Sequence, residues 1–115
     1  MARVEAAPQT VVAAGLEATL AAATADNFEF TNSVDQRTWI WVDNGDAAPH
    51  DLTVITNETR DGNAVADRVV TVPAGEHRLV GPFPAGIYNQ ADGTVQADFS
   101  DHTGMTYAVI SLPAR

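Results

Sequence analysis

The sequence contains neither cysteine nor lysine. Without cysteine the chain cannot form a disulfide, a thiolate nucleophile or a zinc–thiolate site. Its strong bases are six arginines that are spread along the chain, and fifteen acidic residues bring the net charge to −9. Because phosphate backbones and anionic membrane surfaces attract clustered Lys and Arg, we expect neither nucleic acid nor a membrane as a partner.

Long hydrophobic runs are also missing. No apolar segment approaches the roughly 20 residues that a membrane-spanning helix needs. The nearest candidate is the alanine-rich stretch of residues 11–25, which Gly15 and Glu17 interrupt. This stretch lacks the basic start and the long apolar centre of a signal peptide. We therefore expect the protein to stay, or to be assembled, where it is made.

Catalytic motifs are absent as well, since no serine stands in a G-x-S-x-G elbow. The three histidines, His50, His77 and His102, are far apart in the sequence and lie at predicted strand ends or turns. His50 is followed by Asp51, and His102 is preceded by Asp101. Adjacent strand residues point to opposite faces, so neither dipeptide is suited to act as a catalytic pair. We expect no enzymatic activity.

Acidic and amide side chains gather around two predicted turns. Oxygen ligands on turns suit calcium, but no glutamate closes a twelve-residue EF-hand loop. Asp and Asn are also the residues that turns use for their own hydrogen bonds, which explains both groups more simply. We therefore expect no metal and no cofactor. The two groups are Asp43, Asn44, Asp46 and Asp51, and Asp98, Asp101 and His102.

The residues that are abundant favour strands. Val and Thr are β-formers, and from residue 37 onward short alternating segments are separated by turns at about 8–12-residue intervals. The turn Asn44-Gly45-Asp46 predicts a hairpin, and residues 73–76 (PAGE) predict a tight turn. This pattern predicts an all-β, antiparallel sandwich or small barrel. The expected strands are residues 37–43, 51–56, 68–72, 77–80, 94–99 and 105–112.

The first 25 residues differ from the rest because they are rich in alanine and contain no aromatic residue. Alanine favours a short helix over residues 16–25, but the threonines and the missing caps favour an extended arm or edge strand. We expect the extended form. The predicted division is an arm or edge segment over residues 1–25 and a β-sandwich domain over residues 26–115.

Two expected strands are apolar on both faces. In residues 37–43, Trp39 and Trp41 point one way while Ile40 and Val42 point the other. The second face must be covered, either by the N-terminal arm or by another protein. The tryptophans are either part of the core or an exposed platform for stacking on sugars, and we expect core. The predicted core is Trp39, Trp41, Val54, Val70, Val72, Val95, Phe99, Tyr107 and Val109.

Several motifs occur together along most of the chain. They are residues 15–20 (GLEATL) with 26–28 (DNF), 37–46 (RTWIWVDNGD), 72–76 (VPAGE), 81–84 (GPFP), 88–89 (YN) and 92–95 (DGTV). In this order they resemble small β-rich capsid decoration (cement) or minor capsid proteins of tailed phages and related viruses. The resemblance implies a structural protein of the virion and brings no catalytic residues.

The resulting expectation is a non-enzymatic, jelly-roll-like β-sandwich that binds the outer surface of a viral capsid and stabilises the shell. Its expected partners are the major capsid protein and copies of itself in a homotrimer. Two alternatives stay open: a carbohydrate- or receptor-binding module of a tail, and a head–tail joining or tail protein. The residues expected to contact the partner are Val11, Val12, Leu16, Leu20, Phe28 and Phe30.

Overall fold

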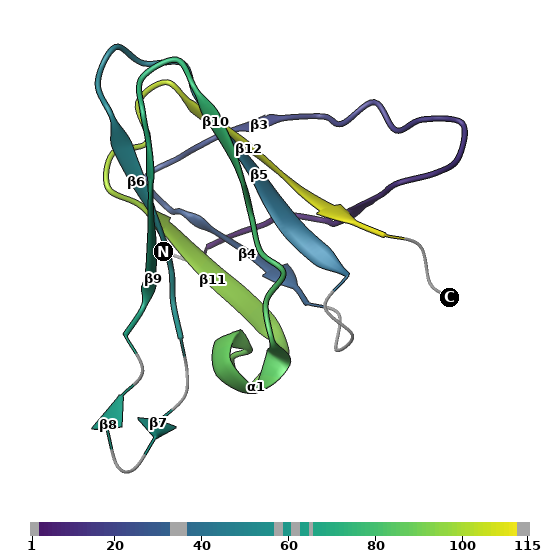
Figure 1. Cartoon of the computed structure of the whole chain (residues 1–115), viewed down its shortest axis with the longest axis vertical. Coiled ribbons are helices and arrows are strands. Elements are labelled where there is room, and N and C mark those ends of the chain that lie inside the picture. Colours follow the sequence, from purple (N-terminus) through teal and green to yellow (C-terminus); the bar gives the residue numbers. More distant parts are fainter. Residues whose placement is uncertain (1–2, 33–36, 57–58, 61–62, 65, 113–115) are drawn as a thin grey trace.

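The computed structural model describes residues 3–32, 37–56, 59–60, 63–64 and 66–112 (Figure 1). This part of the chain is all-β, with two mixed sheets and a single turn of helix, as in a β-sandwich. None of its helices is long and apolar enough to cross a membrane. The elements are β1 (Val4–Glu5), β2 (Gln9–Thr10), β3 (Ala21–Ala22), β4 (Phe28–Thr31), β5 (Thr38–Asn44), β6 (His50–Val54), β7 (Thr59–Arg60), β8 (Asn63–Ala64), β9 (Arg68–Val72), β10 (His77–Val80), α1 (Ala85–Tyr88), β11 (Thr94–Phe99) and β12 (Met105–Ser111).

The strands form two large sheets and one small hairpin. The first, which we call the β4 sheet, has the order β1-β4-β11-β6-β9. The second, the β5 sheet, has the order β10-β5-β12-β2, and β3 also pairs with β12. Within the described residues, strands β7 and β8 pair with each other and with no other strand. Two pairings, β1 with β4 and β2 with β12, are parallel, so the expected purely antiparallel pattern is wrong at these edges.

The predicted strands are confirmed, three of them with the expected bounds: residues 68–72, 77–80 and 94–99. The alternating sequence of β5 alternates in burial, with Thr38, Ile40, Val42 and Asn44 facing inward. This is the pleat of a strand with one face in the core. Strand β4 was not expected, because the sequence pattern of strands and turns was interpreted from residue 37 onward.

The core lies between the two sheets and is built around aromatic contacts. The rings of Phe28 on β4 and Tyr107 on β12 stack with centroids 4.0 Å apart, which joins one sheet to the other. Phe99 lies against both rings, at 5.6 Å from Phe28 and 5.8 Å from Tyr107. The buried core comprises mainly Phe28, Phe30, Ile40, Val42, Leu52, Val54, Val72, Val80, Phe83, Val95, Ala97, Met105, Tyr107 and Val109.

The core prediction is right at five positions and wrong for the two tryptophans. Trp39 and Trp41 are half-buried on the outer face of the β5 sheet. The register with β12 explains this, because Ile40 pairs with Val109 and Val42 pairs with Tyr107 on the inner face. Val70 and Phe99 are partly buried against the core. The confirmed positions are Val54, Val72, Val95, Tyr107 and Val109.

The turn at Asn44-Gly45-Asp46 does not close a hairpin, because β5 and β6 belong to different sheets. The buried side chain of Asn44 organises the crossing. Its Oδ1 accepts a hydrogen bond from the Asp46 N–H at 2.9 Å, while its Nδ2 donates to the carbonyls of Ala48 at 2.9 Å and Val72 at 3.0 Å. These bonds satisfy backbone groups that a hairpin ladder would otherwise pair.

The N-terminal segment is extended and contains no helix over residues 16–25. Strand β1 lies along β4, whereas β2 and β3 both lie along β12. The segment therefore passes from the edge of one sheet to the edge of the other and covers that side of the sandwich (Figure 1). Arg3 adds an ion pair with Asp98 on β11. Sequence alone left the extended form and the helix open, and the structure excludes the helix.

Candidate docking surface

The outer face of the β5 sheet carries large apolar side chains. Trp39 and Trp41 on β5 are half-buried, and Leu79 on β10 is 64% exposed. His77 on β10 is exposed beside them. We call these four residues the tryptophan face. Contiguous exposed apolar side chains are a feature by which interaction sites are recognised, so this face is the candidate docking surface.

Strand register brings these side chains together. Leu79 pairs with Trp41 across β10 and β5, so the two side chains lie on the same face. On the other side of β5, Trp41 pairs with Ala108 and Trp39 pairs with Ile110. In the sequence, Trp39 and Trp41 are two residues apart and therefore share one face of their strand. Only the strand pairing shows that Leu79 lies beside them.

The end of β10 is shaped by close packing against Trp39. Gly81 has φ +130°, and a Cβ at this position would lie 3.0 Å from the Trp39 Cβ. Only glycine combines this backbone conformation with so close an approach. The chain can therefore turn away after Val80 without displacing the indole ring from the tryptophan face.

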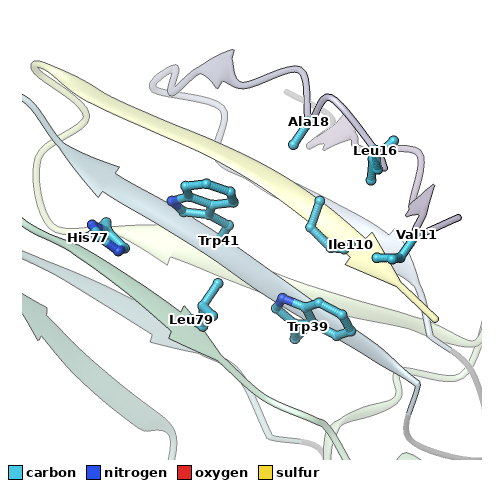
Figure 2. Close-up of a pocket in the computed structure, with 8 residues that line it drawn as sticks. All are labelled: Val11, Leu16, Ala18, Trp39, Trp41, His77, Leu79 and Ile110. Atoms are coloured by element: carbon cyan, nitrogen blue, oxygen red, sulfur yellow. The ribbon is translucent and has the colours of Figure 1, made fainter. Parts of the chain in front are cut away.

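A loop from the N-terminal segment covers the far side of this face. We call residues 11–20 the N-terminal loop. Its side chains Val11, Leu16 and Ala18, together with the tryptophan face, line a cavity of about 280 Å³ (Figure 2). Beneath the segment Ala108 and Ile110 are almost fully buried, at 3% and 4% exposure. The N-terminal segment therefore covers the outer apolar face of β12, as expected for a strand that is apolar on both faces. This cover does not extend to Leu79 on β10.

The side chain of Gln9 holds the base of the N-terminal loop. Its Nε2 donates to the Thr19 carbonyl at 2.9 Å, and its Oε1 accepts from the Thr19 N–H at 2.8 Å. At the other end of the loop the Gly15 N–H donates to the Val12 carbonyl at 2.9 Å, with Gly15 at φ +101°. The N-terminal loop is thus held at its base by Gln9 and contains a hydrogen-bonded turn at Gly15.

Polar groups are few on the tryptophan face. The rings of Trp41 and His77 lie 5.9 Å apart at 45°. The Trp41 Nε1 is buried and has no hydrogen-bond partner among the described residues. A buried donor without an acceptor carries a free-energy cost.

The six residues expected to contact a partner lie in three different environments: the cavity, the exposed surface and the core. Val11 and Leu16 face the cavity, whereas Val12 is 50% and Leu20 is 37% exposed. Phe28 and Phe30 are completely buried in the core, so the expectation that they contact a partner is wrong. Both rings point inward from β4, where an alternating FEFT sequence turns both aromatic residues to the same side.

The side chains of the acidic turns make hydrogen bonds within the turns. Asp46 lies 2.8 Å from the His50 Nε2, and this hydrogen bond is the main reason why the pKa of Asp46 is lowered. The pKa of Asp101 is lowered chiefly by the Thr103 N–H. Within the described ranges no three His, Asp or Glu side chains are placed to share a metal ion.

The comparisons with known proteins identify no relative. No family model, no curated protein and no solved structure matches this chain. The likeness to capsid decoration proteins therefore depends on the sequence motifs alone.

Proposed function

We propose that this chain is a non-enzymatic structural protein that docks onto a protein shell through the tryptophan face. The observation that carries the proposal is the 64% exposure of Leu79 beside two half-buried tryptophans. Burying a leucine side chain on binding contributes about 1.5–3 kcal/mol. Tryptophan is among the residues that dominate binding energy at protein interfaces.

The motif resemblance suggests what the shell is. It favours the major capsid protein as the partner and the outer surface of a virion as the location, with the copies of this chain gathered in trimers. The jelly-roll-like connectivity belongs to the same proposal. The acidic surface, at net charge −9, supports a protein that is soluble until it docks.

The first experiment measures how many copies the source particles contain. Quantitative mass spectrometry of purified particles compares this chain with the most abundant shell protein. A ratio near one supports decoration of the whole shell. A few copies per particle favour a joining or tail component, and complete absence rejects a virion role.

The second experiment tests the docking face with a matched pair of variants. Leu79→Asp places a charge in the tryptophan face, whereas Val69→Asp places the same charge on β9, where Val69 is 54% exposed. We expect Leu79→Asp to weaken binding to depleted shells at least about tenfold, which corresponds to 1.4 kcal/mol. Val69→Asp should bind like the unmodified protein. Equal binding by both variants would reject this face.

A carbohydrate-binding module is the second candidate, and one observation favours it. The outward placement of Trp39 and Trp41 offers ring surfaces on which a sugar can stack. Against it, the cavity lining is apolar apart from His77 and the indole N–H groups, whereas a sugar presents many hydroxyls. A glycan array with the native chain and Trp41→Ala decides this. A glycan signal that the folded variant loses would support sugar binding.

A further inference from the structure

A second recess lies on the side of the sandwich that the N-terminal segment leaves bare. It runs between β9 and β10, the last strands of the two sheets, and has a volume of about 450 Å³. Its apolar lining includes Val70, Phe83, Ile87 and Tyr88, and its two charged lining residues are Arg68 and Arg78. We call it the arginine groove.

The charge of the arginine groove contrasts with that of the molecule. The chain has only six strong bases against fifteen acids, yet among the described residues two bases and no acidic side chain line this groove. Arg78 donates to Glu76 at 3.1 Å and to the His77 carbonyl at 2.8 Å. Arg68 is exposed and has no ion pair with the described part of the chain. The guanidinium of Arg68 is therefore free to bind a carboxylate.

The N-terminal loop has the complementary properties. While Val11, Leu16 and Ala18 face its own sheet, Val12 and Leu20 are exposed. Glu17 is also exposed and is the only acid between residues 6 and 25. Like Arg68, it makes no ion pair with the residues that the structure describes. Because Gln9 and the Gly15 turn hold the loop closed, little conformational entropy remains to be lost on docking.

The loop and the groove lie on opposite sides of the molecule. In Figure 1 the purple loop extends to the right beyond the strands, whereas β9 lies beside β6 on the left of the view. The loop of one copy can therefore meet the groove of another but not its own. A contact between two different patches is heterologous, and it closes into a ring when the rotation between copies permits.

We infer that the N-terminal loop of one copy docks into the arginine groove of the next, with Glu17 paired to Arg68. The apolar side chains Val12 and Leu20 then meet the apolar lining of the groove. Two copies with net charges of −9 repel each other, so a local pair of opposite charges has to set the docking position. The inference specifies the contact between copies in the trimer of the proposed function. It depends on the proposed self-association and not on shell docking, because no shell takes part in the contact.

A charge-swap experiment on the purified full chain tests the contact. Light scattering over a concentration series gives the molar mass of the native chain, of Glu17→Arg, of Arg68→Glu and of the double variant. The control is Glu5→Arg, which makes the same change of charge at an exposed acid on β1. Circular dichroism establishes that each variant is folded.

We expect the native chain and Glu5→Arg to self-associate, and each variant at position 17 or 68 to raise the dissociation constant by about tenfold or more. The double variant should return toward the native value, because the pair is restored with its signs exchanged. A native chain that stays monomeric at all concentrations would overturn the inference. Self-association that neither single variant weakens, or that the double variant does not restore, would overturn it too. Because Leu79 lines the arginine groove as well as the tryptophan face, the molar mass of Leu79→Asp is measured in the same series. Self-association of this variant like that of the native chain, together with weakened shell binding, separates shell docking from the contact between copies.

Discussion

The two sides of the sandwich are completed in different ways. On one side the edge strands β4 and β12 are covered, because β1 pairs with β4 and both β2 and β3 pair with β12. On the other side β9 and β10 are the last strands of their sheets and border the arginine groove. An uncovered edge can recruit further chains. The N-terminal segment closes one side with strand pairing, whereas the other side ends, among the described residues, in two unpaired strand edges, where we propose that the next copy docks.

The largest expected effect comes from the core beneath the covered side. Phe28→Ala removes a fully buried ring that stacks on Tyr107 and contacts Phe99. We expect a loss of about 3–5 kcal/mol in the free energy of unfolding, because a large cavity is left. Chemical denaturation measures it. On the bare side Val69→Ala should change stability by less than about 0.5 kcal/mol, and equal losses would remove the distinction.

Deleting residues 1–22 should uncover one side and make it resemble the other. The deletion removes hydrogen bonds such as Val4 N–H to Asn27 carbonyl and Val11 N–H to Ser111 carbonyl, and it exposes Ile110. At about 0.5–1.5 kcal/mol per net hydrogen bond, we expect a total loss of about 2–4 kcal/mol. The thermal midpoint measures it. An unchanged midpoint would show that the segment adds no stability to β4 and β12.

Asn44→Ala should loosen the attachment of β9 to the rest of the sandwich. The side chain is fully buried and donates to the Val72 carbonyl at the end of β9. Its loss leaves buried backbone groups without partners, at a cost of about 1–3 kcal/mol. Hydrogen exchange of the β9 amides should increase more than that of the β4 amides. Equal increases in both strands would contradict a local attachment.

Acid should have the smallest and most widely spread effect. In the folded chain, hydrogen bonds hold the pKa values of Asp46, Asp92 and Asp101 below the ordinary value of 3.8. These carboxylates therefore stabilise the fold fully above their unfolded pKa, and the contribution disappears as the pH falls through the folded values. Denaturation midpoints should decrease below about pH 4. Asp46→Asn should make the decrease less steep, and an identical acid profile would exclude the His50–Asp46 hydrogen bond as a cause.

Most of the strands could be predicted from the sequence, but their partners could not. Alternation and turn residues depend on neighbours in the chain, which explains why residues 68–72, 77–80 and 94–99 were predicted correctly. The Asn44-Gly45-Asp46 turn has the composition of a hairpin and yet joins two sheets. Turn chemistry specifies where the chain reverses, whereas hydrophobic contacts far apart in sequence specify which sheet it joins.

The candidate site shows the same division. The tryptophans and the alanine-rich segment were evident in the sequence, but strand β5 is apolar on both faces, so the pattern could not say which face points inward. Leu79 and Arg68 carried no local signal, because an isolated Leu or Arg in a strand has many ordinary explanations. Their neighbours across β5 and along the groove distinguish them, and these neighbours are distant in the chain.

The sequence by itself determined the all-β class, the positions of the main strands and the acidic charge, because these follow from local periodicity and composition. Only the tertiary structure decided that Ile40 and Val42 face inward while Trp39 and Trp41 face outward. It also decided that the N-terminal segment covers one side and that β9 and β10 leave the other side bare. These outcomes depend on long-range register, in which a shift of one residue reverses every side chain.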